Sequence, residues 1–174
     1  MPPWSYNRRL MSRLDRFKSA QASADSGFEF ALAEIRSGGK RSHWIWYVFP
    51  QLAGLGMSPA SQQFAIADEA EAIEYLRDPD LRSRLLTITT AVAERLHVRQ
   101  PGSLRVLMGS DTDARKVVSS LTLFRRVAER LHAAEGLEGY QRLASVGDEV
   151  LAAAAAEGFA PCEYTLRRLR EDLE

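Results

Sequence analysis

The chain has 174 residues, of which 45% are hydrophobic and 26% are charged, and its 23 basic and 23 acidic side chains cancel. This composition is typical of one globular domain. A neutral chain has no general attraction for nucleic acid or for an anionic membrane surface, so neither is expected as a partner.

Cysteine content and hydropathy indicate the cellular compartment in which the protein is expected. A single cysteine, Cys162, excludes an intramolecular disulfide and fits a reducing compartment. No apolar run approaches the roughly 18 residues of a membrane span. The N-terminal arginines are not followed by the apolar segment that a secretory signal requires. We therefore expect a cytoplasmic protein, and no motif in the chain predicts a cofactor.

The N-terminal part predicts an extension followed by short helices. Residues 1–12 are predicted to be a flexible extension with a basic bias, and a short helix is expected to start at its end. Apolar residues at i, i+3, i+4 and i+7 predict a helix over residues 28–35. Asp25 or Ser26 is expected as its N-cap and Gly38 as its C-terminal stop.

The next segments are less regular. Residues 43–49 are aromatic and apolar, and they fit either a buried strand or a buried helical turn that Pro50 ends. Two glycines and a proline indicate a loop over residues 52–61. A short helix is predicted over 69–76, and Asp78 before a proline is expected to cap the helix that follows.

The second half of the chain predicts longer helices. Ser110 and Asp113 have the spacing of a capping box at the start of one of them. The apolar residues recur at helical spacing over 79–96, 117–131, 140–156 and 163–173, and a short apolar piece lies at 104–108.

These elements together predict the fold class. No stretch alternates apolar and polar residues convincingly, and no segment repeats. We expect residues 13–174 to form one all-α domain, a compact multi-helix bundle of irregular topology with about eight helices.

The glycine-containing motifs do not match known nucleotide loops. A phosphate-binding loop ending at residues 39–40 would need glycine where Glu34 stands and serine or threonine where Arg41 stands. The glycines at 54–56 lack the third glycine of a dinucleotide fingerprint, because Pro59 occupies that position.

Metal binding and acyl transfer are also not predicted. His43, His97, His132 and Cys162 show none of the paired spacings of a metal site, so no metal ligand is assigned. The chain has no G-x-S-x-G motif. Cys162 is interpreted as a small buried side chain rather than a nucleophile.

Two sequence motifs are specific enough to indicate a protein family. These are HW-x-W-x-x-FPQ at residues 43–51 and SS-x-TLF at residues 119–124. With LDRF at 14–17 and GLG at 54–56, they resemble the bacterial family DUF 1810, a domain of unknown function, in the family's order over about residues 13–170.

The resemblance implies a compact, mainly helical fold, which favours helix for residues 43–49, and it supplies no reaction. The family usually has a histidine where Asp78 stands. Its members are sometimes labelled calpastatin-like. A calpain inhibitor of that kind is largely disordered, whereas this chain has the periodic apolar residues of a folded core.

If residues 40–49 form a helix, several side chains that could bind a ligand become neighbours. Such a helix places Lys40, His43 and Tyr47 along one edge with Trp44 beside them, because residues three and four apart are neighbours on a helix. On the later helix, Lys116 falls within an apolar arc, so it either lines a cleft or extends its ammonium group to water.

Our leading hypothesis is a cleft between the two motifs that binds a small anionic or aromatic ligand. The expected ligand-binding residues are Lys40, His43, Trp44, Gln51, Lys116 and Ser120. Ser119 is expected to face away as a structural hydroxyl. The alternative is that the aromatic residues of both motifs simply form a core.

Two other functions remain open. One is an enzyme acting on a nucleotide-like or ADP-ribose-like substrate, with His43 as the candidate acid or base. The other is a protein–protein interaction module, which would present a large exposed apolar patch.

Overall fold

The computed structural model describes residues 12–98 and 102–171, so the predicted extension lies, apart from Ser12, outside the described residues. Within these ranges the chain forms ten helices and no strand, which confirms the all-α prediction. The helices are α1 (Asp15–Gln21), α2 (Phe28–Arg36), α3 (Ile45–Val48), α4 (Pro59–Gln63), α5 (Glu69–Arg77), α6 (Pro79–Val98), α7 (Leu104–Met108), α8 (Asp111–Glu135), α9 (Glu138–Ala156) and α10 (Glu163–Glu171). None of the described helices is long and apolar enough to cross a membrane.

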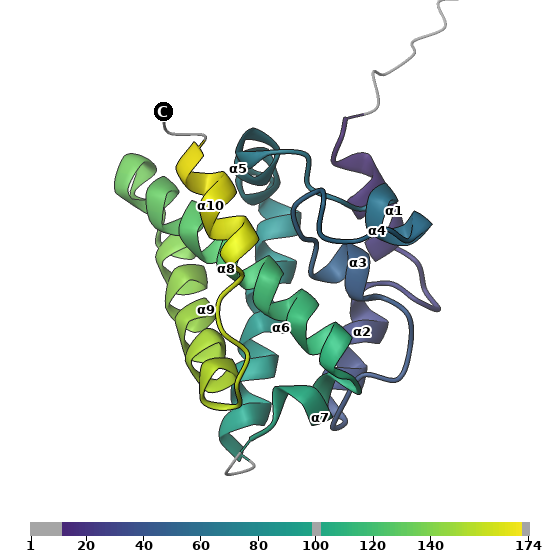
Figure 1. The fold of residues 1–174 in the computed structure, drawn as a ribbon. Coiled ribbons are helices and arrows are strands. Elements are labelled where there is room, and N and C mark those ends of the chain that lie inside the picture. The colour runs from purple at the N-terminus through teal and green to yellow at the C-terminus, as the bar shows by residue number, and fades with distance from the viewer. Residues whose placement is uncertain (1–11, 99–101, 172–174) are drawn as a thin grey trace, which may run out of the picture.

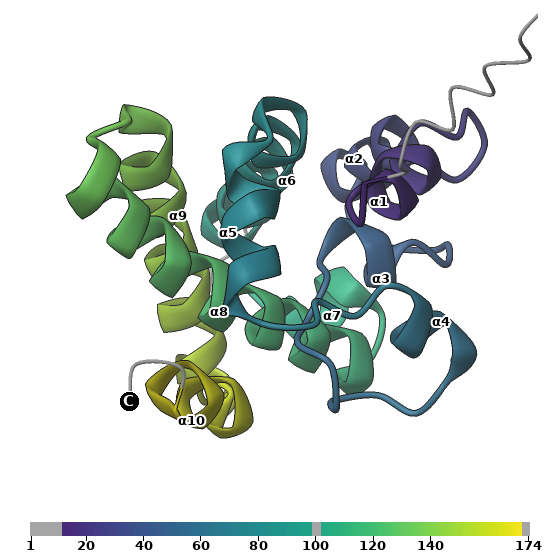
Figure 2. The same ribbon diagram turned by 90° about the horizontal axis from the view of Figure 1, so that it is seen from above.

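The long helix α8 organises the fold. It packs against α9, α5, α7, α10 and α3, while α6 packs against α9, α2 and α5. Seen from above, α9, α6 and α2 lie in a row, and α8 runs across that row (Figures 1 and 2). The C-terminal α10 lies against α8, on the side away from that row.

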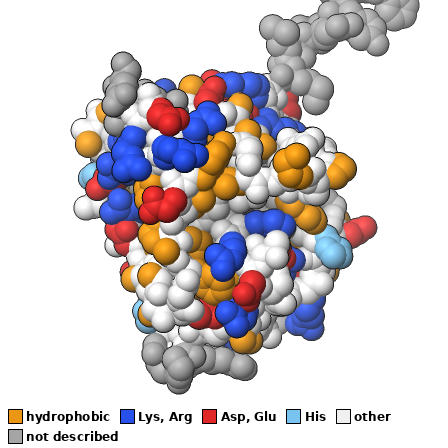
Figure 3. Space-filling model, viewed as in Figure 1, with side chains coloured by type: hydrophobic (Ala, Val, Ile, Leu, Met, Phe, Trp, Pro, Cys, Tyr) orange, Lys and Arg blue, Asp and Glu red, His pale blue; other side chains and the backbone are white. Residues whose placement is uncertain are grey.

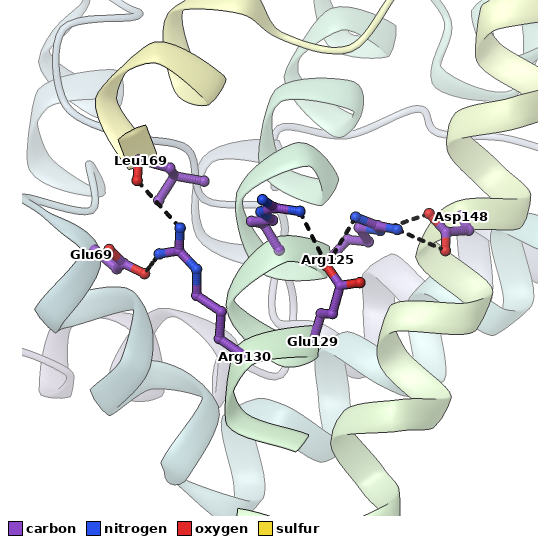
Figure 4. Close-up of polar contacts among 7 residues, drawn as sticks. Glu69, Arg125, Glu129, Arg130, Asp148 and Leu169 are labelled. Atoms are coloured by element: carbon purple, nitrogen blue, oxygen red, sulfur yellow. Dashed lines mark hydrogen bonds and ion pairs between the residues drawn. The ribbon is translucent and has the colours of Figure 1, made fainter. Parts of the chain in front are cut away.

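Two arginines of α8 tie neighbouring helices to it. Arg130 pairs with Glu69 at the start of α5 and donates to the carbonyl oxygen of Leu169 in α10 (Figure 4). Arg125 donates to the Asp148 carboxylate of α9, with Nε 2.7 Å from Oδ1. Helices far apart in sequence are thus joined through one helix.

The core is continuous and rich in aromatic residues. Phe17, Tyr75 and Phe124 are fully buried, and the Tyr75 ring lies 5.3 Å from that of Phe17 and 4.8 Å from that of Phe124. Offset and edge-on ring pairs at these distances are favourable beyond the area they bury. The SS-x-TLF motif therefore contributes to the core through its phenylalanine.

Several helix ends follow the expected local signals. The Asp78 carboxylate accepts hydrogen bonds from the backbone of Asp80 and Leu81, which confirms its capping role. Ser110 Oγ accepts from the Asp113 N–H at 3.1 Å, as the capping-box spacing predicts. The two glycines that follow α2 have positive φ angles, and their N–H groups bond back into its last turn. The predicted stop at Gly38 is therefore confirmed.

The start of α2 differs from the prediction. Gly27 is the N-cap, rather than Asp25 or Ser26. The Gly27 N–H donates to the carbonyl oxygen of Ser23 at 2.9 Å, and a Cβ on Gly27 would lie only 2.2 Å from that oxygen. The tight turn therefore requires glycine here.

The segment predicted as a loop over residues 52–61 contains the start of a helix. Helix α4 begins at Pro59, and Ser58 Oγ accepts from the Ser61 N–H at 3.1 Å. Serine followed by proline is the same cap-and-first-residue signal that correctly placed the start of α6. This additional short helix is one reason why ten helices form instead of about eight.

Helix α3 is shorter than the helical reading of residues 40–49 predicted. Only Ile45–Val48 are helical, and Trp44 is the N-cap. The Lys40 N–H donates to the Leu107 carbonyl oxygen, and the Glu34 carboxylate accepts from the Arg41 N–H. These backbone donors are committed to other elements, so a helix cannot extend back to residue 40.

Candidate functional site

A cluster of three charges joins the two sequence motifs. The Lys40 ammonium lies 2.7 Å from one oxygen of the Asp113 carboxylate, and the Lys116 ammonium lies 3.3 Å from the other. All three side chains are largely buried, with exposed fractions of 8% for Lys40, 17% for Asp113 and 18% for Lys116. Two cations share one carboxylate, so the cluster has a net charge of +1.

Aromatic rings support both cations of the cluster. The Lys40 ammonium lies 5.4 Å from the centre of the Trp44 ring, and the Lys116 ammonium lies 4.9 Å from that of Trp46. Ammonium groups at such distances are attracted by the negative face of the ring. The two tryptophans of the first motif therefore help to hold the cations in place.

A cavity of about 670 Å³ lies beside this cluster, within the usual size range of small-molecule sites. Three segments form it: residues 51–61 before and within α4, the first turns of α8, and the α9–α10 connection at 158–163. Figure 3 shows this face of the molecule, where basic and hydrophobic side chains surround a hollow.

Helix α8 presents a polar stripe to the cavity. Thr112, Arg115, Lys116 and Ser119 all line it, at positions i, i+3, i+4 and i+7 of one helix face. Arg115 is exposed and has no carboxylate partner among the described residues. The stripe therefore offers two cations and two hydroxyl groups to one volume.

Ser119 is the most informative member of the stripe. The residue is only 4% exposed, and its Oγ has no hydrogen-bond partner in the part of the chain that the structure describes. A buried hydroxyl without a partner is costly. Six side chains in the described part of the chain have a buried polar atom without a hydrogen-bond partner, and Ser119 is the one of them that lines the cavity.

Part of the cavity lining is apolar. Leu55, Val118, Phe159 and Pro161 contribute to it, and the Arg115 guanidinium carbon lies 5.2 Å from the centre of the Phe159 ring. The exposed carboxylate of Glu163 lies at the same cavity. The site thus combines an apolar surface with polar groups on two sides.

Tyr164 fastens the loop that forms one wall. Its hydroxyl donates to the Ala53 carbonyl oxygen at 2.7 Å and accepts from the Arg168 guanidinium at 3.1 Å. Gly54 has a φ of 99°, and a Cβ there would lie 2.3 Å from the Tyr164 Oη. Glycine at this position lets α10 hold the loop.

A substitution at Gly54 tests this fastening. We expect Gly54→Ala to lower the free energy of unfolding by about 2 to 3 kcal/mol, through backbone strain and displacement of the Tyr164 hydroxyl. Gly158→Ala is the matched control, because its φ is 101° and a Cβ there meets nothing within 4 Å. Urea unfolding measures both. Equal losses in the two variants would contradict the role of Tyr164.

The structure places the six predicted ligand-binding residues in different environments. Gln51 and Lys116 line the cavity, and Lys40 is joined to it through Asp113. Trp44 is fully buried in the core. His43 is exposed, with its ring stacked 6.5 Å from that of Trp46.

The two serines of the second motif exchange the orientations expected for them. Ser120 is fully buried and is not part of the cavity lining, whereas Ser119, expected to face away, lines it. The cavity lies on the side of α8 opposite Val117, near Ser119. The ligand was expected on the apolar side of this helix, which packs against other helices instead.

Other residues of the site were not predicted from the sequence. Thr112 lies four residues before Lys116 and Arg115 lies three residues after Thr112, so both could have been found from helical spacing. Phe159 comes from the segment after α9, and no local pattern connects that segment to α8. The predicted contact between the two motifs does form, because α3 packs on α8.

Glu34 fixes the polypeptide that leads into the first motif. Its carboxylate accepts from the N–H groups of Arg41 and Ser42, from Ser42 Oγ and from Trp44 Nε1, at 2.6–3.1 Å. Burial opposes ionisation of Glu34, but these four hydrogen bonds outweigh it and lower its pKa to about 2. The carboxylate is therefore ionised at neutral pH.

The other polar residues of note have structural partners. Asp78 caps α6 and lies 2.6 Å from the Lys18 ammonium. Burial opposes its ionisation, but Lys18 and the N–H groups of α6 lower its pKa. Among the described residues, no group of three or more histidine, cysteine, aspartate or glutamate side chains could hold a metal ion.

The fold and the site together define a class: a compact all-helical protein built around one long helix, with a partly basic cavity at its first turns. The chain belongs to the family described as "Protein of unknown function (DUF1810)", whose model matches residues 11–145. The resemblance predicted from the sequence is thereby confirmed.

A solved structure supports this assignment. The conserved hypothetical protein Rv1873 from Mycobacterium tuberculosis is 32% identical, with a TM-score of 0.67. The match covers 88% of this chain and 94% of that one. No curated protein matches the chain.

Proposed function

We propose that the protein binds a small anionic ligand with an aromatic or apolar body in the cavity beside α8. The observation that carries this proposal is the unpaired charge of Arg115, next to a cluster whose two lysines share one carboxylate. An anion would relieve this excess of positive charge. The apolar side of the cavity would receive the rest of the molecule.

The burial of Lys116 strengthens its interaction with an anion. Charges in a cavity are screened less by water and salt than those on an open surface. Lys116 is held by Asp113 and Trp46, so little of its side-chain freedom remains to be lost on binding.

A thermal-shift screen of nucleotides, dinucleotides, ADP-ribose, sugar phosphates and organic acids tests the proposal. A ligand at about 100 times its dissociation constant adds roughly 2.7 kcal/mol to stability, which raises the midpoint by several degrees. We expect Arg115→Gln to reduce this shift strongly. Arg126→Gln is the matched control, because Arg126 lies further along α8 and pairs with Glu129 outside the cavity.

Cys162 provides an independent measurement. It is the only cysteine of the chain, is half-buried, and lines the cavity. We expect a ligand found in the screen to slow alkylation of its thiol several-fold, because access passes through the occupied space. Alkylation at an unchanged rate, at a saturating ligand concentration, would place the ligand elsewhere.

The geometry does not favour either of the alternative functions. His43, the candidate acid or base of an enzyme, lies outside the cavity lining. The large exposed hydrophobic residues in the described part of the chain come from five separate segments; they are Phe30, Met57, Val98, Val106 and Leu137. Scattered residues of this kind are normal on a protein surface.

A further inference from the structure

We infer that the anionic group of the ligand is a phosphate monoester, held by the polar stripe of Thr112, Arg115, Lys116 and Ser119. This inference rests on the proposed ligand-binding function of the cavity and adds the chemical class. It depends on the number of donors in the stripe, on their charge and on the size of the remaining cavity.

The donors outnumber what a carboxylate can use. One arginine guanidinium satisfies both oxygens of a carboxylate in a bidentate pair. In this cavity, that pairing with Arg115 would leave the Lys116 ammonium and two hydroxyl groups unused. A phosphate monoester has three peripheral oxygens and a charge between −1.5 and −2 near pH 7. It can therefore accept from several members of the stripe together.

The charge along the stripe, with Glu163 left aside, also favours a dianion. Arg115 contributes one positive charge, and the cluster of Lys40, Asp113 and Lys116 contributes a second. Glu163, at the start of α10, adds one negative charge at the cavity, so the net charge of the whole cavity is +1. The stripe itself begins in the first turn of the 25-residue α8, where the helix dipole further favours negative charge.

Ser119 is the second observation that points to a ligand. Its buried Oγ has no partner among the described residues, although it lines the cavity. A phosphate oxygen could accept its hydrogen and remove the cost of an unsatisfied hydroxyl. Dipole and cations alone would fit many anions. Six buried polar atoms of the described residues lack a hydrogen-bond partner, and Ser119 is the one of these residues that lines the cavity, so it is the one placed to add a specific contact.

The rest of the cavity requires an organic body. A water molecule takes about 30 Å³ of liquid volume, so 670 Å³ is far more than a phosphate group fills. Phe159 and Leu55 offer an apolar surface, and the Glu163 carboxylate can accept from a hydroxyl or amino group. A monophosphate of a planar, donor-bearing molecule satisfies all of these features.

Isothermal titration calorimetry of the full chain tests the inference with matched probes. The probes are adenosine monophosphate against adenosine, and phenyl phosphate against benzoate. We expect each phosphate to bind at least about ten-fold more tightly than its partner, because hydrogen bonds to a charged group are the strong ones. Inorganic phosphate should bind more weakly than either ester.

Three variants locate the phosphate. Arg115→Gln should weaken phosphate binding about ten-fold or more, and Arg126→Gln should leave it unchanged. Ser119→Ala should weaken it several-fold while leaving stability equal or higher, because it removes a buried hydroxyl that has no partner. A purely structural serine would not separate affinity from stability in this way.

The outcomes distinguish the two proposals. Carboxylates that bind as tightly as the phosphates, with loss in Arg115→Gln, would overturn the phosphate assignment and leave the anion cavity standing. Phosphate binding that neither Arg115→Gln nor Ser119→Ala weakens would also overturn it. Failure of every probe here, together with silence in the thermal-shift screen, would reject the ligand-binding function itself.

Discussion

Replacing Asp113 with asparagine is expected to lower the free energy of unfolding by about 3 to 5 kcal/mol, because two largely buried lysines would lose the carboxylate they share. For a chain of this size the midpoint of thermal unfolding should fall by roughly 6 to 20 °C. Circular dichroism during heating measures the change.

Asp111→Asn is the matched control for this substitution. Asp111 lies in the same first turn of α8, but it and its partner Arg105 are both about half exposed. An exposed ion pair contributes at most about 1 kcal/mol. Adding Lys40→Met to Asp113→Asn should restore part of the loss, since only one buried cation then lacks a partner. Similar losses in the two asparagine variants would show that burial does not strengthen the Asp113 contacts.

The second large effect is expected at Glu34. Glu34→Gln keeps the size of the side chain but removes its negative charge and replaces one acceptor oxygen with an amide NH2 group. We expect a loss of about 2 to 3 kcal/mol at pH 7, because hydrogen bonds from four donors to a charged group are weakened. Exposed Glu29 on the same helix provides the control variant Glu29→Gln.

The effect of Glu34 should depend on pH in a defined direction. Its pKa is about 2 in the folded chain and about 4.5 when unfolded, so the unfolded chain binds its proton first as the pH falls. The stability that the ionised carboxylate provides is present above about pH 4.5 and declines as the pH falls towards 2. The difference between wild type and Glu34→Gln should therefore shrink over this range. A difference that stays constant from pH 6 to pH 3 would contradict the lowered pKa.

Local hydrogen bonding explains which elements could be predicted from the sequence. The caps at Asp78 and Ser110 depend on atoms within three residues, so the sequence contains the whole signal. The helix predicted to include residues 40–44 does not form there, because its hydrogen-bonding competitors are not local in sequence. There the backbone donors are taken by Glu34 and by the Leu107 carbonyl oxygen, and the latter lies 67 positions along the chain from Lys40. No local pattern can reveal such a competitor.

The residues of the candidate site also fall into two groups, those that local helical periodicity can place and those that it cannot. Lys116 could be placed because its angle on α8 follows from helical periodicity. Ser119 was misjudged because periodicity shows which side of a helix is apolar, but not which side meets a cavity. The Lys40–Asp113 pair and the wall at Phe159 depend on how distant segments pack. Those contacts require the three-dimensional structure.

The order of the cavity walls along the chain has a consequence for synthesis. The ribosome completes residues 51–61 and the stripe of α8 well before residues 158–163, and the Tyr164 hydroxyl holds the loop only once α10 exists. A growing chain therefore displays its cationic stripe before the wall that closes the cavity has been made. We expect the proposed ligand binding to be one of the last properties that the nascent protein acquires, and chains cut before Gly158 to stay folded in part but to lack that binding.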